Sequence, residues 1–427
     1  MIQSIVIGMI TVVMLGEYVV SGLALPNVFK LVPEILSLVT ALIVVFAGVR
    51  DRFQFVAAKY WLVFAFAAFV MLSGIVINQV GTGPTVAGMR MYLRAIPFFF
   101  LPAVFQFTDE QIKQQLKVLL VLGFLQVPIA GLQRWIVYSE GRWTGDEVIG
   151  TLQISSILSI FLISGVLLLV GLRLRNHIDK STFLLSGILL LIPTMINETK
   201  GTLVLLPIGL LVALSIGVRR GQRIRVAAVA LALFVGFGGV FIPVYDFFMR
   251  NASFDASIVE FFTDEEKLGK YLAKEGAGVG ATDAESVGRG DAIRISVEYM
   301  SREPIRFAFG LGLGSVSNSS LGESFAGPYR HLFQYIATMS FSVFLLEIGS
   351  LGVAAVFSLY WLVFWDSIAV ARNDEGLHGA FAIGWGGVTV VIVLATVYKS
   401  IHVFESLSYL FWYFSGLMSA RRLQMST

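Results

Sequence analysis

The sequence predicts an all-α protein that crosses a membrane many times. Of its 427 residues, 56% are hydrophobic and only 14% are charged, and the mean hydropathy is +0.81. A soluble domain carries about a quarter charged residues. The apolar residues also fall into runs close to the roughly 20 residues that a helical span needs. These observations exclude a soluble globular protein and favour a polytopic membrane protein.

We expect twelve spans, one for each apolar run. The first run lacks the basic start of a cleaved signal peptide, so we expect it to be a transmembrane helix. The tenth run is longer than a bilayer requires, and part of it is expected to lie outside. The predicted spans are residues 3–23, 31–48, 59–78, 89–107, 115–137, 152–172, 181–197, 201–218, 226–245, 333–364, 379–399 and 403–420.

Basic loops predict the orientation of these spans. Lysine and arginine in short loops mark the cytoplasmic side. Basic segments follow the second span ("RDRFQFVAAK"), the sixth ("RLRNHIDK"), the eighth ("RRGQRIR") and the twelfth ("ARRL"). All four lie on one side if both termini are cytoplasmic, and we therefore expect that topology.

The same topology leaves one large loop on the outer face. The chain divides into residues 1–245 with spans one to nine, residues 246–332 as the external loop domain, and residues 333–427 with spans ten to twelve. Within the loop, Thr263 and Glu266 have the spacing of a capping box. Ile293, Val297 and Met300 predict the apolar face of an amphipathic helix at the membrane surface.

Composition excludes several kinds of site. The chain has no cysteine, which excludes disulfides and thiolate metal sites. No pair among its four histidines has metal-ligand spacing, and the net charge of +3 is too small to indicate nucleic acid. We expect no metal, no cofactor and no nucleic-acid partner.

Several cations are predicted on the outer face, against the usual bias. The stretch "INETKGT" joins two apolar runs, so Lys200 is expected at membrane depth. Arg90 and Arg94 share one helix face because they are four residues apart. The large loop adds Arg289, Arg294, Arg302, Arg306, Arg330 and His331.

A charge within a span costs about 3 kcal/mol unless it faces a polar cavity or a partner. An anion at the outer interface that fits several cations is a lipid phosphate or diphosphate, to which arginine donates paired hydrogen bonds. Alternatives stay open: Lys200 can pair with Glu198 or reach the headgroups, Arg90 and Arg94 can be interfacial anchors, and the loop arginines can be solvated. Glu347 is expected to fix helix packing.

Three motifs follow one another along the chain. The first is a basic residue and a glycine that open a helix, in "NETKGTLVLLP". The second is "GRGDAIRISVEYMSREPIRFAFGLGLGSV", with Arg289 after a glycine, then Pro304 and Gly-x-Gly-x-Gly. The third is "LLEIGSLGVAAV", with Glu347, Gly349 and Gly352. In order and spacing, the chain resembles the O-antigen ligase and Wzy-type polysaccharide polymerase superfamily of bacterial inner-membrane glycosyltransferases.

The chain also departs from that pattern. Family members often have arginine where Lys200 stands, and lysine keeps the charge without the paired geometry. Many ligases carry His-Asn about nine residues before the Glu-x-Gly, where this chain has Thr338 and Met339. This difference favours a polymerase over a ligase.

The resemblance implies a GT-C-like glycosyltransferase in the bacterial inner membrane, with a periplasmic large loop. Its donor is expected to be an undecaprenyl-diphosphate-linked oligosaccharide, and its acceptor a growing surface polysaccharide or, for a ligase, lipid A core. The implied transfer is inverting and metal-independent, with membrane lipids around the protein and, for a polymerase, a chain-length regulator as a partner.

Candidate roles follow from the need to stabilise a departing diphosphate. The expected diphosphate-binding residues are Lys200, Arg289, Arg90, Arg94, Arg294 and Arg330. His331 and Glu198 are candidate bases for the acceptor hydroxyl, and Glu347 and Gly349 are expected to be structural. A transporter is the alternative from another class, and it predicts polar groups at the bilayer midplane instead.

Overall fold

The computed structural model describes residues 2–50, 53–141, 145–197, 199–218, 223–249, 257–273, 278–279, 287–319 and 321–426. Every regular element in these ranges is a helix. The elements are α1 (Ile2–Gly22), η1 (Asn27–Leu31), α2 (Val32–Arg50), α3 (Ala58–Ile77), α4 (Thr82–Leu93), α5 (Ile96–Val104), α6 (Asp109–Ser139), α7 (Ser155–Leu174), α8 (Lys180–Ile196), α9 (Thr202–Gly217), α10 (Arg223–Met249), α11 (Ile258–Thr263), α12 (Glu265–Leu272), α13 (Arg289–Ser301), α14 (Pro304–Phe309), η4 (Glu323–Phe325), α15 (Arg330–Phe333), α16 (Ser340–Asn373), α17 (Leu377–Thr396), η5 (Ile401–Val403) and α18 (Glu405–Gln424).

Seven helices of the described chain are long and apolar enough to cross a membrane. They are α1, α2 with most of η1, α3, α6, α7, α16 and α17. Helices α8 and α9 and the Phe234–Phe247 part of α10 are apolar but shorter. The all-helical membrane class is therefore confirmed, whereas the count of twelve spans and the identity of the two faces stay predictions.

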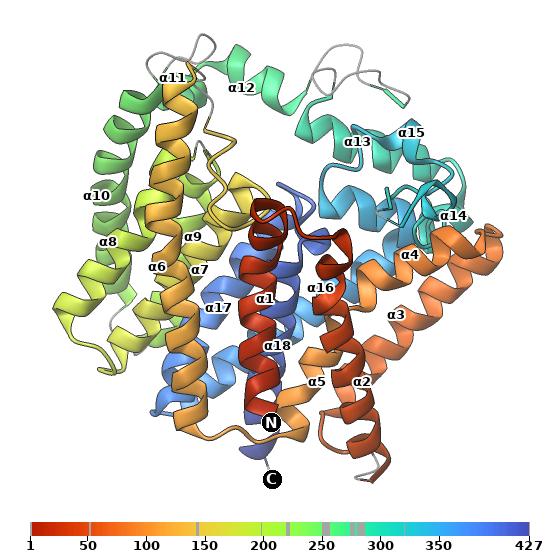
Figure 1. Cartoon of the computed structure of the whole chain (residues 1–427), viewed down its shortest axis with the longest axis horizontal. Helices are drawn as coiled ribbons and strands as arrows, with labels where there is room; N and C mark the ends of the chain where they lie inside the picture. Colours follow the sequence, from red (N-terminus) through yellow and green to blue (C-terminus); the bar gives the residue numbers. More distant parts are fainter. Residues whose placement is uncertain are drawn as a thin grey trace.

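The helices form a bundle with two distinct ends (Figure 1). Helices α11 to α13 lie at one end, which we call the loop end, and α15 lies on the same side. Helix α1 begins and α18 ends at the opposite end, which we call the terminal end. Placing both chain ends on one side agrees with the predicted topology.

Close backbone contacts hold the centre of the bundle together. Helix α17 is the most buried of the candidate spans and packs against α7, α9 and α16. A Cβ atom at Gly171 of α7 would collide with the Ala380 carbonyl, and one at Gly384 of α17 would collide with Leu167. Small residues let helix backbones approach in this way, and such packing stabilises membrane bundles.

The fourth predicted span, residues 89–107, is wrong as a single helix. Helix α4 ends at Leu93, and α5 begins at Ile96 with Pro97 in its first turn. A proline cannot donate to the preceding turn, and its ring collides with the carbonyl four residues earlier. Arg90 and Arg94 consequently lie at the C-terminal end of α4 rather than in the first turns of a span.

The tenth predicted span also differs from the structure. Helix α16 begins at Ser340 rather than near residue 333, because the Ser340 amide donates to the Lys399 carbonyl at 3.1 Å and fixes the helix start there. Gly349 then interrupts α16 with φ 67° and ψ −177°. The kink frees two carbonyls, which accept from the amides of Leu311 (2.7 Å) and Gly312 (3.1 Å).

Two expectations within the predicted loop domain are wrong in detail. Helix α12 is capped by Asp264, whose side chain accepts from two backbone amides, and not by Thr263. The buried face of α13 contains Ile295 and Met300, which pack with the start of α16, whereas Val297 is 38% exposed. The buried face differs from the predicted one because α13 packs against the start of α16.

Replacing Gly349 with alanine is expected to lower the free energy of unfolding by about 2 kcal/mol or more, because its φ/ψ values lie in a region that is essentially restricted to glycine. A Cβ there would also collide with the Ala308 carbonyl. Thermal unfolding of the purified protein in detergent measures the effect.

Gly131→Ala is the matched control, since nothing lies within 4 Å of a Cβ at that helical position. Alanine is the better helix former, so we expect unchanged or slightly higher stability there. Equal unfolding temperatures for the two variants would contradict a strained backbone at Gly349.

Candidate functional site

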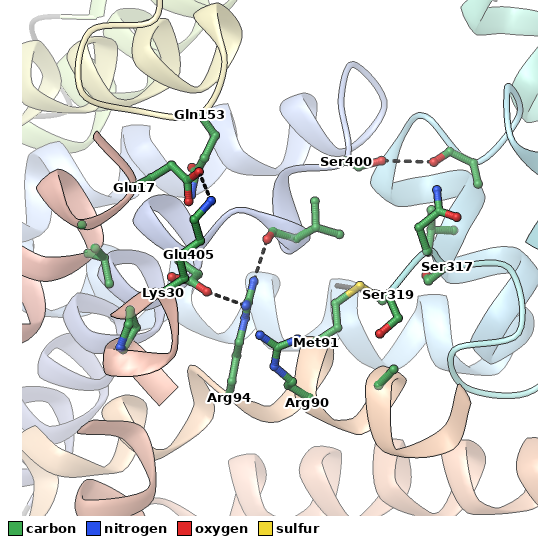
Figure 2. Close-up of a pocket in the computed structure, with 18 of the residues that line it drawn as sticks. Glu17, Lys30, Arg90, Met91, Arg94, Gln153, Ser317, Ser319, Ser400 and Glu405 are labelled. Carbon is green, nitrogen blue, oxygen red and sulfur yellow. Dashed lines mark hydrogen bonds and ion pairs between the residues drawn. The ribbon is translucent and has the colours of Figure 1, made fainter. Parts of the chain in front are cut away.

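A cavity of about 520 Å³ lies where α1, η1, α2, α4 and the start of α16 meet (Figure 2). Four cations and two carboxylates line it together with uncharged polar groups. The charged lining residues are Glu17, Lys30, Arg90, Arg94, Arg330 and Glu405, and the polar ones are Gln153, Ser317, Asn318, Ser319, Gln334 and Ser400. Segments far apart in the sequence thus form one hollow.

Carboxylates of the protein hold the two arginines of α4. Arg90 contacts Glu34 at 2.6 Å, and Arg94 contacts Glu405 at 2.7 Å and Glu34 at 3.4 Å. Arg94 also donates to the Val403 carbonyl at 2.6 Å. The Arg94 side chain is only 10% exposed, against 24% for Arg90. Glu34 and Glu405 thus supply a counter-charge from within the protein, so these two arginines do not need a bound anion to balance them.

The other two cations of the cavity have more exposed partners. Lys30 contacts Glu17 at 2.7 Å, and both side chains are more than a third exposed. Arg330 pairs with Glu323, whose side chain is 86% exposed. Exposed ion pairs contribute only about 0–1 kcal/mol. These two cations can therefore exchange their partners for a bound anion at low cost.

Glu347 anchors a loop that lines the cavity. It is fully buried in α16 and accepts from the Val316 amide at 3.2 Å and from the Ser317 hydroxyl at 2.7 Å. The loop begins with three glycines of positive φ, at positions 310, 312 and 314. The Gly-x-Gly-x-Gly and Glu-x-Gly motifs therefore form one structural unit, which presents residues 317–319 to the cavity.

Lys200 and Arg289 come together in a second place, around aromatic rings. The Lys200 ammonium lies 4.0 Å from the centre of the Phe261 ring. The Arg289 guanidinium lies 4.1 Å from the centre of Tyr271 and 5.0 Å from that of Tyr398. Cations are attracted to aromatic faces at such distances. We call these five residues the cation–aromatic cluster.

The residues after α17 connect this cluster with the cavity. Arg289 donates to the Tyr398 carbonyl at 3.4 Å, and Arg94 donates to the carbonyl of Val403. Lys399 and Ser400 lie between them. Burial, followed by the nearby Arg289, lowers the pKa of Lys399. Lys200 and Arg289 do not line the cavity, so the six predicted diphosphate-binding residues do not form a single group.

The remaining predicted site residues lie elsewhere. Arg294 is on the exposed face of α13, paired with Asp291 at 2.9 Å and Glu298 at 3.1 Å. His331 follows Arg330 on α15 but is exposed and does not line the cavity in the described structure. Glu198 lies outside the described residues. Arg294 and His331 are thus separated from the cavity because their helices turn them to the surface.

Sequence reasoning did not select Glu34, Glu405 and Lys30 as site residues. Glu34 lies in the first turn of α2, and Glu405 is the first residue of α18. Both acids lie at the start of helices whose first residues are predicted on the same side of the membrane as Arg90 and Arg94. This shared side is the feature of the sequence by which the two acids could have been selected. No cluster of three or more potential metal-ligating side chains occurs in the described ranges.

Comparison with known proteins does not identify the chain. No family model matches it, and no curated protein is similar to it.

Proposed function

We propose that the chain is a membrane glycosyltransferase that extends a surface polysaccharide from undecaprenyl-diphosphate-linked oligosaccharide donors on the periplasmic side. One observation carries the proposal: the cavity of about 520 Å³ combines four cations with carboxylates and uncharged polar groups. Cations suit a leaving diphosphate, and hydroxyl and amide groups suit sugars. Soluble sugar transferases often use a metal ion to stabilise the negative charge of the leaving diphosphate. In the proposal, lysine and arginine side chains stabilise it instead.

Not all four cations are equally suited to the diphosphate. Arg94 is buried between two carboxylates and serves as a fixed charge that orients its neighbours. Arg90 shares Glu34 with Arg94, so it can turn to a phosphate while Glu34 keeps a partner. Arg330 and Lys30 have exposed partners. We therefore assign Arg90, Arg330 and Lys30 to the diphosphate.

An apolar cavity next to the charged one supports a lipid-linked donor. It has a volume of about 220 Å³ and is lined mainly by apolar residues of α3, α4, α16 and α18. Met91 of α4 lines both cavities. Leu72 and Leu93 at its edge are about half exposed, so the cavity is open at the side of the bundle. A lipid whose diphosphate contacts Arg90 can place its isoprenoid chain there.

In the proposed step, an acceptor hydroxyl oxygen attacks the anomeric carbon of the donor sugar. The bond between that carbon and the diphosphate oxygen breaks, and its electron pair leaves with the lipid diphosphate. A carboxylate takes the hydroxyl proton. Glu17 is the better candidate for this role, because it lines the cavity and is 36% exposed, whereas Glu405 is held by Arg94. The proposal replaces His331 with Glu17 as the base.

The test uses purified protein in liposomes with a defined undecaprenyl-diphosphate-linked oligosaccharide. We expect longer lipid-linked glycans from the wild type, detected by mass spectrometry. Arg90→Ala is expected to lower the rate about 100-fold, which is the usual effect of removing one group that stabilises transition-state charge. Arg306→Ala is the control, since Arg306 of α14 pairs with Glu303 just before that helix and does not line the cavity.

Two outcomes would contradict the proposal. The first is no transfer by the wild type from any lipid-diphosphate donor. The second is full activity of the Arg90→Ala variant. Adding lipid A core to the same liposomes separates the polymerase from the ligase alternative, because a ligase moves the glycan to that acceptor and leaves its length unchanged.

Lys200 and Arg289 can be tested in the same assay. Single alanine variants are expected to lower activity by about tenfold, because the cation–aromatic cluster holds the segment before Val403, to which Arg94 donates. The conservative variant Arg289→Lys keeps the charge and should recover part of the rate. Full activity of both alanine variants in a normally folded protein would remove the cluster from the mechanism.

A further inference from the structure

A second cavity, independent of the proposed active site, lies at the terminal end between α6 and α7. It has a volume of about 340 Å³. Its lining consists mostly of leucine, isoleucine and phenylalanine side chains, and two lysines and a histidine also line it. The start of α6 lies beside the start of α1, since Gln3 donates to the Gln111 carbonyl at 3.0 Å. We call this cavity the α6–α7 groove.

One end of the groove is closed and apolar. Leu190 of α8 lies against Gly123 of α6 and Gly165 of α7, where added Cβ atoms would meet it at 3.0 and 3.1 Å. Leucine and phenylalanine side chains line the walls above it. From Lys113 to Gly123 the groove follows α6 for about 15 Å, at ~1.5 Å per residue. This shape and chemistry fit an acyl chain.

The other end is open and basic. Lys113, Lys117 and His177 line the groove at the end where α6 begins and α7 ends. Lys113 contacts Glu110 at 2.6 Å, but Glu110 is 76% exposed, so this pair is weak. Lys117 is exposed and makes no direct ion pair within the described ranges. His177 belongs to the basic segment "RLRNHIDK", which the charge rule places in the cytoplasm.

We propose that the α6–α7 groove binds one anionic phospholipid, such as phosphatidylglycerol. An acyl chain lies against Gly123, Gly165 and Leu190, and the phosphate contacts Lys117 and His177. Basic pockets between membrane helices on the cytoplasmic side bind anionic headgroups in this manner. The lipid would join α6 to α7, which contact each other less than either contacts α8. Its expected consequence is a more stable bundle.

The test titrates delipidated, full-length protein with phosphatidylglycerol and with phosphatidylcholine of the same acyl chains, followed by native mass spectrometry. We expect one tightly retained phosphatidylglycerol and a clear preference over phosphatidylcholine. Lys117→Gln should reduce that preference about fivefold, as expected for one lysine at a membrane surface. Leu120→Trp fills the groove and should reduce the binding of both lipids.

Two matched variants serve as controls. Lys180→Gln removes an exposed cation that belongs to the same basic segment as His177 but does not line the groove. Leu132→Trp alters an exposed position elsewhere on α6. Neither should change lipid binding. An unchanged preference in Lys117→Gln overturns the proposal, and so does unchanged binding in Leu120→Trp. Lys117 is a surface residue, so its variant decides the question even if Leu120→Trp does not fold.

Discussion

Arg94→Ala is expected to lower the free energy of unfolding by about 3–5 kcal/mol, the usual cost of removing one partner of a buried ion pair. The Arg94 side chain is 10% exposed and contacts Glu405, Glu34 and the Val403 carbonyl. Its loss leaves Glu405 without that partner in a largely buried position. Thermal unfolding in detergent measures the effect, and the transfer assay is expected to show a loss of about 100-fold or more.

A double variant separates stability from activity. Arg94→Met with Glu405→Leu removes both charges, and replacing a buried pair with apolar residues is often neutral or stabilising. Glu34 keeps Arg90 as its partner. We expect the double variant to regain most of the stability but none of the transfer activity. If it transferred sugar at the wild-type rate, Arg94 would have no place in the donor site.

Lys30→Ala is the reference for an exposed pair. Both Lys30 and Glu17 are more than a third exposed, so its effect on unfolding should stay below about 1 kcal/mol. A similar loss of stability in Lys30→Ala and Arg94→Ala would show that burial does not distinguish the two pairs.

Glu347→Ala is expected to lower the free energy of unfolding by about 2–4 kcal/mol, because two donors would lose their acceptor in the interior. The Val316 amide and the Ser317 hydroxyl both donate to the same carboxylate oxygen of Glu347. The loop that lines the cavity would then lose its side-chain anchor and be held by backbone hydrogen bonds, among them those of the Leu311 and Gly312 amides. Amide hydrogen exchange in residues 311–319 should become faster.

Two smaller chemical changes serve as controls for Glu347→Ala. Glu347→Gln keeps an acceptor oxygen, so its effect should be about half as large or less. Ser317→Ala removes one of the two donors, and about 1 kcal/mol is expected. Unchanged exchange in Glu347→Ala would mean that Glu347 does not hold the loop.

The sequence predicted the helices well where they are long, apolar runs. The candidate spans α1, α2, α3, α6, α7 and α17 lie on predicted ones, because burial in lipid requires a run of fixed length and its composition is local information. The prediction failed at Pro97, where one apolar run contains two helices, and at Ser340, whose position depends on a hydrogen bond to the distant Lys399. A hydropathy pattern indicates neither the break at Pro97 nor the helix start at Ser340.

The candidate site was predicted in part. Arg90, Arg94 and Arg330 line one cavity, and Lys200 and Arg289 meet around aromatic rings. The sequence did not indicate that these are two groups, nor that Glu34 and Glu405 balance the arginines. Arg294 and His331 were selected because they are basic residues of the predicted loop, but both face the surface.

The amino-acid sequence by itself determined that this chain is a helical membrane protein with unusual cations near one end of its helices. Only the tertiary structure decided which cations share a cavity and which carboxylates hold them. The physical reason is that hydropathy and helix spacing act over a few residues along the chain. Ion pairs such as Arg94 with Glu405 instead join residues more than 300 positions apart, and only packing brings them within hydrogen-bonding distance.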